Sequence, residues 1–575
     1  MGLNFAKVAW GRYPRNTLLI GSTSHVLTKL ARVGLTAAAM VLAASSFALA
    51  ETTATPAPKF VLVAQASPAP TASPNPFTYR GYVRAYDFTR QNAYNGYGVP
   101  SGPGGKANQS SENNAIGVHA DYAFQGSGIY VGGSYMYANP LNQCSNPATS
   151  LYPATNANPC YQSKSAPAIN PDTTLPQFEM STLYEAYAAY NANGFYFKGG
   201  DQVITTPWAQ GADSRLKPIS FQGVDLSYKF DMGTSGSFLL EGSDYWQWEC
   251  RTCSNFDHGT LLTVVNPGGY AYPGANALPT TVYDPTETPI NNNGFFLGRI
   301  GYVGPKTLPL TANLWYYDFD NIANLFWLDA KMPLGTSKLK PYLALQAGDE
   351  TSSTDDILGK IDSTVFGLQA GFYPMSNVLL AAGFDTIPVR TDSAVSIPGY
   401  TCNANTHQIT PTHSYKEPTF PYFLPGGSAG TAQCTADNAA GTVYDVYYGG
   451  IASPYTDSYA ADPLFTTGGT QGMVDRRSPG SSFKVGATFT SDDKQLVASV
   501  AQEWYDYSNP GYSTSTNSTD FDVQYFFSHV PKTGLYRGFS FRFRAFSRSA
   551  TNFAPPGEQL AGLFKYDRFQ AEYDF

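Results

Sequence analysis

The sequence lacks the patterns that mark most enzymes and helical membrane proteins. No apolar run reaches the roughly 20 residues that a membrane-spanning helix needs, and the longest, residues 33–49, falls short. The six His residues are scattered, and there is no His-Glu-x-x-His pair, no phosphate-cradling glycine loop and no Gly-x-Ser-x-Gly elbow. We therefore expect no catalytic residue, no metal site and no cofactor.

Charge is also scarce. Charged residues make up 14% of the chain, against about 25% in an average soluble domain. The formal net charge is −8, so nucleic acid is not an expected partner. Aromatic residues, in contrast, reach 15%, with 41 Tyr. This composition suits the aromatic girdles of a lipid-facing barrel.

The first 50 residues are organised like an export signal. Residues 1–32 carry five basic residues and no acid, and residues 33–49 are mostly apolar. Ala48-Leu49-Ala50 fits a small-x-small cleavage site. We expect a signal peptide over 1–50 and, because residues 51–76 are rich in Ala, Pro, Thr and Ser, a flexible periplasmic leader after it.

Residues 77–575 alternate strand-like runs with turns. In a typical run, Phe541 and Phe543 share one face and Arg542 and Arg544 the other, which is the period of two of a strand. Short connections alternate with long ones, as expected of periplasmic turns and extracellular loops. The pattern predicts an all-β, transmembrane antiparallel β-barrel of about 18 strands with long extracellular loops. The expected strands are 77–90, 113–124, 129–138, 179–191, 195–204, 219–230, 237–248, 293–303, 308–318, 322–333, 338–348, 361–374, 378–388, 482–490, 495–507, 517–529, 536–549 and 564–575.

The run 564–575 resembles the closing strand of a bacterial outer-membrane barrel. It alternates cleanly, with Phe569, Tyr573 and Phe575 on one face, and it ends in Phe. The resemblance implies a bacterial outer-membrane location, surrounding lipid, and insertion by the barrel-assembly machinery through this strand. An ordinary terminal strand of a soluble sheet is the alternative.

The six cysteines are expected to form disulfides, because the chain carries an export signal. All fall in long connections, and pairing within one connection is the simplest arrangement. For the Cys-Arg-Thr-Cys stretch, a redox motif is the alternative, although no helix N-terminus is evident there to activate a thiol. The expected pairs are Cys144 with Cys160, Cys250 with Cys253, and Cys402 with Cys434.

A row of basic residues is expected on the inner wall. Barrel closure places the last strands beside the first, so that their polar faces form one arc with few acids of its own, Glu572 and Asp574. Such a charge would attract anionic groups into a pore. The alternative is that these residues pair with Asp and Glu across the lumen and only stabilise the wall. The row consists of Arg80, Arg84, Lys484, Arg542, Arg544, Arg548 and Arg568.

One connection carries a family resemblance. Asp213-Ser214-Arg215-Leu216, followed by Pro218 and by Phe221-Gln222-Gly223, resembles the third loop of the OprD family of outer-membrane porins, in residues and in its place after the fifth strand. The resemblance implies an 18-stranded barrel whose third loop folds into the lumen. Loop 205–218, with Trp208, Asp213, Ser214 and Arg215, is then the expected constriction.

The resemblance also implies a function. A porin of this kind is a passive diffusion channel for small charged solutes such as amino acids and carboxylates, and it is not an enzyme. It works as a monomer or a trimer. The alternatives are a general, non-selective porin, or a barrel that serves as an adhesin or an enzyme without channel activity.

Overall fold

The structure is a computed structural model of the 575-residue chain. Residues 1–50 and 51–575 form two compact units, and the described residues all belong to the second. The predicted signal peptide over 1–50 lies outside them, as does the predicted leader except for Pro76, so both stay predictions. The structure describes residues 76–94, 106–141, 179–211, 216–251, 253–260, 263–264, 288–289, 292–335, 337–353, 361–388, 390–395, 400–403, 408–411, 426–427, 431–432, 444–448, 451, 453–456, 462–469, 472–474, 479–509, 512–527, 538–550 and 564–575.

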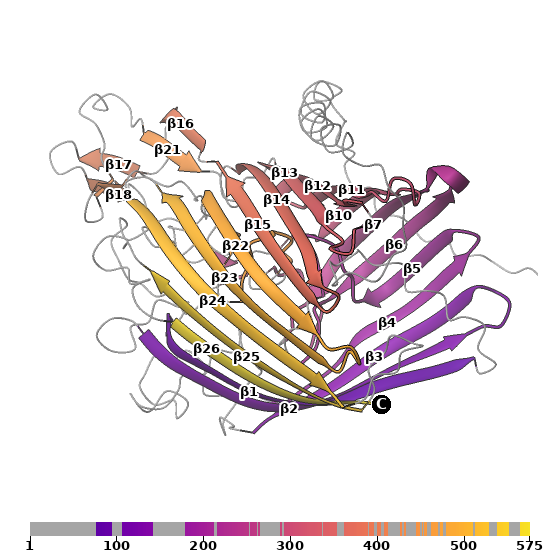
Figure 1. Ribbon diagram of the computed structural model, residues 1–575. Coiled ribbons are helices and arrows are strands. Elements are labelled where there is room, and N and C mark those ends of the chain that lie inside the picture. The colour runs from indigo at the N-terminus through magenta and orange to yellow at the C-terminus, as the bar shows by residue number, and fades with distance from the viewer. Residues whose placement is uncertain are drawn as a thin grey trace, which may run out of the picture. The chain divides into compact units, whose positions relative to one another are not determined.

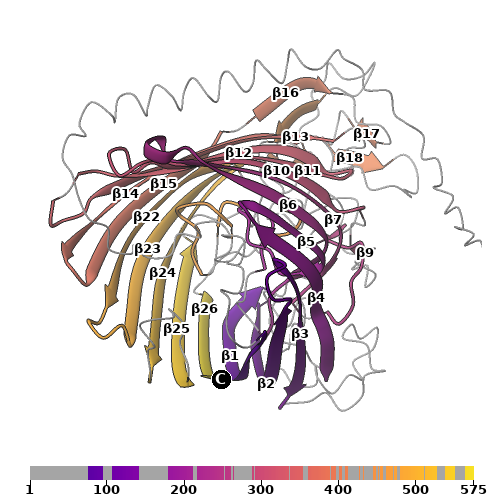
Figure 2. The same cartoon turned by 90° about the vertical axis from the view of Figure 1, so that its right-hand side faces the viewer.

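Eighteen antiparallel strands form one closed sheet, which confirms the predicted fold. Neighbours in the sequence are neighbours in the sheet, and the last strand pairs with the first, so that the yellow and indigo strands lie side by side (Figure 1). The view in Figure 2 shows the sheet curving round on itself. The strands are β1 (Phe77–Tyr94), β2 (Lys106–Ala123), β3 (Ile129–Pro140), β4 (Met180–Ala192), β5 (Phe195–Gln202), β6 (Ser220–Asp231), β7 (Ser237–Glu249), β10 (Phe295–Val303), β11 (Thr311–Phe319), β12 (Ala323–Pro333), β13 (Tyr342–Ser352), β14 (Asp362–Met375), β15 (Val378–Ile387), β22 (Gly480–Thr490), β23 (Leu496–Asn509), β24 (Tyr512–Phe526), β25 (Gly538–Ala550) and β26 (Phe564–Asp574).

The long connections contain four further pairs of short strands. A single turn of 3-10 helix, η2 (Gly233–Ser235), joins β6 and β7. No helix in the described part of the chain has the length and apolar character needed to cross a membrane. The short pairs are β8 (Thr263–Val264) with β9 (Thr288–Pro289), β16 (Arg390–Val395) with β21 (Tyr444–Tyr448), β17 (Tyr400–Asn403) with β18 (Gln408–Pro411), and β19 (Gly426–Gly427) with β20 (Thr431–Ala432).

The starts of three strands differ from their predicted positions by four residues or more, each for a physical reason. β2 begins at Lys106 rather than at 113, because a polar extension continues the pairing with β1 as far as Tyr94. β24 begins at Tyr512 rather than at 517, since it pairs with β23 out to Asn509. β13 begins only at Tyr342, directly after Pro341, which has no N–H to donate to a ladder.

The two faces of the sheet differ in chemistry. Aromatic and aliphatic side chains alternate along the strands and are exposed on the outer face around the barrel, while the residues between them point inward. On β25, Phe541 and Phe543 are exposed and Arg542 and Arg544 lie on the inner face with buried Ser540. Other exposed members of the outer face are Phe296, Ile300, Leu368, Phe384, Phe483, Val500, Phe521 and Phe569.

The tight turns follow their sequences. Asn193 and Gly194 connect β4 to β5 and have φ angles of 54° and 82°. Both angles lie in the left-handed region that Asn and Gly adopt most easily, and two such residues in succession match the twist of a hairpin. This turn chemistry sets the register in which Ala192 faces Phe195.

The seam between β1 and β26 leads to a testable prediction. Gly81 exchanges backbone hydrogen bonds with Phe575 at 3.0 and 2.9 Å, and a Cβ at Gly81 would meet the Phe575 ring and lie 2.7 Å from the Gly117 carbonyl oxygen. Because that backbone atom cannot swing aside, Gly81→Ala should destabilise the barrel by about 1–3 kcal/mol. The midpoint of urea-induced unfolding, followed by the shift in gel mobility, measures the effect.

The matched control is Gly242→Ala on β7. A Cβ there would have no heavy atom within 4 Å, so the free energy of unfolding should change by no more than about 0.5 kcal/mol. Equal effects of the two substitutions would show that close packing at the seam is not the cause.

Candidate functional site

The described residues of loop 205–218, namely 205–211 and 216–218, lie against the inner wall of the barrel. Its Trp208 side chain is fully buried and packs edge-to-face on Trp327 of β12, with ring centroids 5.1 Å apart. The backbone N–H of Trp208 donates to the Tyr317 hydroxyl of β11, at 3.4 Å. The backbone turns back on itself, with the Gly211 N–H donating to the Ile204 carbonyl. Of the predicted constriction residues, Trp208 is thus placed in the lumen, whereas Asp213, Ser214 and Arg215 lie outside the described residues.

The other end of the loop reaches the first strand. The Leu216 carbonyl accepts hydrogen bonds from the Tyr82 hydroxyl at 2.6 Å and from Arg84 Nη1 at 3.4 Å, both on β1. Arg84 also pairs with Glu572 of β26 at 2.5 Å. The described ends of the loop therefore contact the wall at β11 and β12 and at the seam between β1 and β26.

Lys217 anchors the loop between these two ends. Its side chain is fully buried, and its ammonium lies within reach of three acceptors: Glu249 Oε1 at 3.2 Å, the Cys250 carbonyl at 2.6 Å and the Pro218 carbonyl at 3.4 Å. Burial lowers the pKa of Lys217 to about 8, although the Glu249 carboxylate favours the charged form. An ammonium has three donors, so all three have partners here.

A second segment, residues 451–474, also contacts the inner wall through its described residues, 451, 453–456, 462–469 and 472–474. Ala209 and Tyr455 form a parallel β-bridge, so this segment touches loop 205–218 directly. The Tyr455 ring packs on Phe221, Phe295 and Phe319, and its hydroxyl donates to Asn292 at 2.5 Å. The sequence analysis did not predict that part of the longest connection folds inward. The available signal was a set of apolar residues in a stretch expected to face water, namely Ile451, Leu464, Met473 and Val474, all buried.

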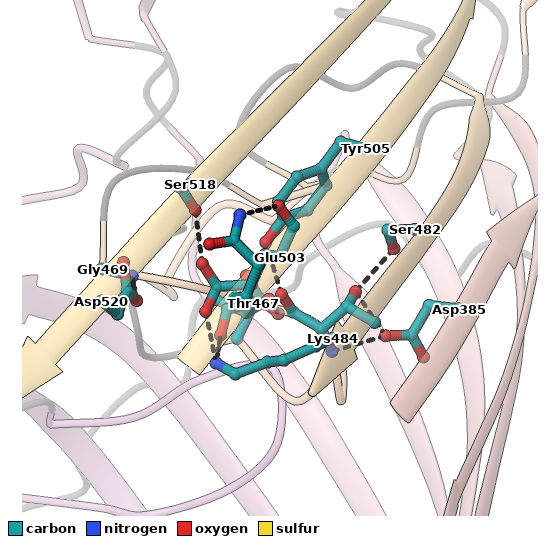
Figure 3. Close-up of polar contacts among 12 residues, drawn as sticks. Asp385, Thr467, Gly469, Ser482, Lys484, Glu503, Tyr505, Ser518 and Asp520 are labelled. Atoms are coloured by element: carbon teal, nitrogen blue, oxygen red, sulfur yellow. Dashed lines mark hydrogen bonds and ion pairs between the residues drawn. The ribbon is translucent and has the colours of Figure 1, made fainter. Parts of the chain in front are cut away.

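Side chains of β15, β22 and β23 hold the second segment (Figure 3). Asp385 of β15 accepts hydrogen bonds from the N–H and the hydroxyl of Thr466, both at 2.7 Å, and the Tyr505 hydroxyl donates to the Thr466 carbonyl. Lys484 donates to the Thr467 carbonyl at 2.7 Å and pairs with Glu503 at 3.0 Å. The described residues 462–469 belong to no strand. Side chains of the wall therefore supply hydrogen-bond partners for backbone groups of this segment.

The segment continues to β24 and β25. The Gly469 N–H donates to Asp520 at 2.6 Å, and a Cβ at Gly469 would collide with the Phe546 ring of β25. Gly469 therefore lets the backbone approach the wall more closely than any other residue would.

All seven residues of the predicted basic row occur on inward-facing strand positions, but they differ in their surroundings. Arg84 and Arg568 are buried, with 5% and 2% exposure. The side chains of Lys484, Arg542 and Arg544 keep 25%, 26% and 15%. Arg548 is half-buried and Arg80 is exposed. The water-accessible part of the row is thus smaller than the sequence pattern indicates.

A carboxylate on the neighbouring strand pairs with two members of the row. Asp522 of β24 accepts two hydrogen bonds from Arg542, at 2.9 and 2.6 Å, and one from Arg544 at 2.9 Å. The sequence analysis considered acids on the same strands and acids across the lumen, and it missed Asp522 on the adjacent strand. The signal was present, since Asp522 lies between the outward Phe521 and the next outward residue, Val523. One carboxylate shared by two guanidinium groups leaves a net charge of +1 at this point.

The opposite part of the wall carries paired acids. Glu185 of β4 lies 3.7 Å from Lys198 and 3.5 Å from His119, and Glu241 lies 3.2 Å from Arg299. Among the described residues, no group of three or more His, Cys, Asp or Glu is arranged to hold a metal ion.

One predicted disulfide is present. Cys250 and Cys253 are bonded directly after β7. Cys144, Cys160 and Cys434 lie outside the described residues, and the side chain of Cys402 in β17 is likewise not described, so the other two pairs stay predictions.

Comparison with known proteins supports the architecture. The chain matches no family model and no curated protein sequence. Three solved structures that it resembles are OccK8 (OprE) of Pseudomonas aeruginosa, with a TM-score of 0.54 and 12% identity, OpdK of the same organism, solved with vanillate, with 0.52 and 11%, and OccAB2 of Acinetobacter baumannii, with 0.55 and 12%. Each match covers 87% of this chain and 98% of the other.

These structures are porins of the OprD/Occ family, so the predicted resemblance is confirmed at the level of the fold. At such low identity the likeness establishes the 18-stranded barrel, and the function has to be argued from the residues of this chain.

The attachment of the second segment can be tested by hydrogen exchange. Asp385→Ala removes the acceptor of the Thr466 N–H, at an expected local cost of about 1–3 kcal/mol, so exchange of that amide should accelerate roughly 10- to 100-fold. The Gly211 amide of loop 205–218 donates to the carbonyl of Ile204, just before the loop, and serves as the internal control. If Thr466 exchanged at an unchanged rate, Asp385 would not be what holds the segment.

Proposed function

We propose that this protein is a porin of a bacterial outer membrane, a passive diffusion channel for small charged solutes, with a preference for those that bear a carboxylate. The observation that carries the proposal is the division of the closed barrel into an apolar, exposed outer face and a charged inner face. In water the two faces would be reversed. In a membrane the outer side chains contact lipid, and the charged residues line an aqueous path.

Two features support a selective channel over a general porin. Loop 205–218 and segment 451–474 both occupy lumen space, and they touch each other at Ala209 and Tyr455. Both are fixed to the wall by several buried contacts, which is the behaviour expected of a permanent constriction. We therefore assign the narrowing of the path to both segments.

The preference for carboxylates rests on the charge of the wall beside this constriction. Arg542 and Arg544 share the single carboxylate of Asp522 and keep part of their surface accessible. A planar guanidinium binds a carboxylate through two parallel hydrogen bonds, and a net positive charge in a narrow path raises the local concentration of anions. OpdK, which has the same fold, was solved with vanillate, a carboxylate.

The proposal assigns no catalysis to the protein. It includes a lipid environment and insertion through β26 by the barrel-assembly machinery. Single-channel recording in planar bilayers tests it directly, because a protein that inserts and never conducts is not a porin. A liposome-swelling panel of amino acids, dicarboxylates and neutral sugars then identifies the solute class.

Shortening the constriction loop should widen the path. Deletion of residues 207–214 removes Trp208 and the turn that rests on β11 and β12, so single-channel conductance should rise and selectivity should fall. A correctly inserted deletion variant with unchanged conductance would contradict the assignment of this loop.

The charged inner wall leads to a prediction in which substitutions that lower and that raise the local charge shift ion selectivity in opposite directions. Arg542→Gln combined with Arg544→Gln changes the local charge from +1 to −1, because Asp522 remains. One charge pair at 4 Å contributes about 4 kcal/mol at an effective dielectric constant near 20, and even a small fraction of this shifts ion preference several-fold, since about 1.4 kcal/mol is a factor of ten. The reversal potential should move toward cation selectivity, and carboxylates should pass more slowly.

Two controls accompany this measurement. Asp522→Asn raises the local charge to +2 and should move the reversal potential the other way. Phe541→Leu and Phe543→Leu alter only the outer face and should leave it unchanged. An effect of the Phe substitutions without an effect of the Arg pair would mean that the inner and outer faces of β25 are assigned the wrong way round.

A further inference from the structure

The Cys250–Cys253 disulfide lies next to the anchor of loop 205–218, and this position gives it a role beyond closing a turn. The Cys250 carbonyl accepts two hydrogen bonds, one from the Cys253 N–H at 3.2 Å inside the turn and one from the buried Lys217 ammonium at 2.6 Å. The same atom thus belongs both to the disulfide-closed turn and to the anchor of the loop.

The anchor depends on that carbonyl. Lys217 and Glu249 are almost completely buried, with exposures of 0% and 1%, and Thr182 of β4 donates to the same Glu249 oxygen at 2.6 Å. A buried ammonium is tolerated only when its donors are satisfied. A shift of the Cys250 carbonyl would leave one donor without an acceptor, in a place that water does not reach.

Both cysteines are partly exposed, in contrast to the anchor beneath them. A small dithiol can therefore reach the bond. One thiolate attacks a sulfur of the disulfide and forms a mixed disulfide, and the second thiolate of the reagent then displaces the protein sulfur. Cys250 and Cys253 gain two electrons and two protons as thiols, and the reagent leaves as a cyclic disulfide.

We infer that the Cys250–Cys253 turn is a positioning element for loop 205–218, acting through Lys217, and that its reduction loosens the loop and enlarges the path through the barrel. The inference rests on the proposed channel function only for its readout in conductance. The Cys-Arg-Thr-Cys stretch would then position loop 205–218, a role that does not need the helix on which an enzymatic redox motif depends.

The test uses the whole protein in planar bilayers, with dithiothreitol added on the side that the long connections face. Reduction should increase the time spent in a higher-conductance state about tenfold relative to the lower one, as expected for loss of one hydrogen bond to a charged group, and reoxidation should reverse the change. Cys250→Ser with Cys253→Ser should show the higher state from the start and should not respond to dithiothreitol. This pair separates the effect from any other disulfide in the chain.

A second variant tests the route through Lys217. Lys217→Met with Glu249→Gln removes the anchor without leaving a buried charge, so its channels should also favour the higher state and should not respond to the reagent. A full response in this variant would overturn the role of Lys217. Wild-type channels that conduct normally and ignore the reagent would overturn the inference and leave the proposed function intact.

Hydrogen exchange keeps the two proposals distinguishable if no conductance is found. The Thr206 amide donates to the Ala209 carbonyl at 3.0 Å, and the Gly211 amide donates to the carbonyl of Ile204, just before the loop, at 2.7 Å. Their exchange should accelerate about tenfold on reduction, and not in the Cys250→Ser/Cys253→Ser variant. Exchange that is unaffected by reduction would refute the anchor by itself, whereas absent conductance with accelerated exchange would refute only the channel.

Discussion

The pairing of β26 with β1 is the constraint on which the rest of this molecule depends. It gives the outermost strands a partner on both sides, with ten consecutive residue pairs from Tyr82 and Asp574 to Gln91 and Lys565, so that the sheet has no free edge. A sheet without edges is one of the two structures that satisfy all backbone groups in lipid. Closure also gives every strand residue one of two environments, the outer face or the lumen, which in the proposed channel contact lipid and solute respectively.

Closure creates a second requirement, because 18 strands enclose more space than their own side chains fill. Two irregular segments occupy part of it, and irregular backbone inside a barrel needs partners for its N–H and C=O groups. The wall supplies them through long polar side chains: Tyr82 and Arg84 bond the Leu216 carbonyl, Tyr505 bonds that of Thr466, and Lys484 that of Thr467. Much of the inner polar face is therefore used to hold these two segments, and the proposed solute path would run along the inner side chains that remain accessible.

This double use explains why the basic residues are not equivalent. Arg84 is buried, paired with Glu572 and hydrogen-bonded to the Leu216 carbonyl, so its charge is largely neutralised within the protein. Arg542 and Arg544 share one carboxylate and remain partly accessible. Wall-stabilising ion pairing thus describes Arg84, whereas solute binding is what we propose for Arg542 and Arg544.

By itself the sequence determined the strands, the alternation of the two faces and the tight turns, because each depends on residues within a few positions of one another. Phe541 faces out and Arg542 faces in by the period of a strand alone, and Asn193-Gly194 specifies its own hairpin. Only the tertiary structure decided that Asp522 lies between two arginines, that residues 451–474 fold inward, and that Lys217 meets the Cys250 carbonyl. Those contacts join residues of different strands and loops. The local pattern of one strand does not show which side chains of other strands and loops will lie beside its own.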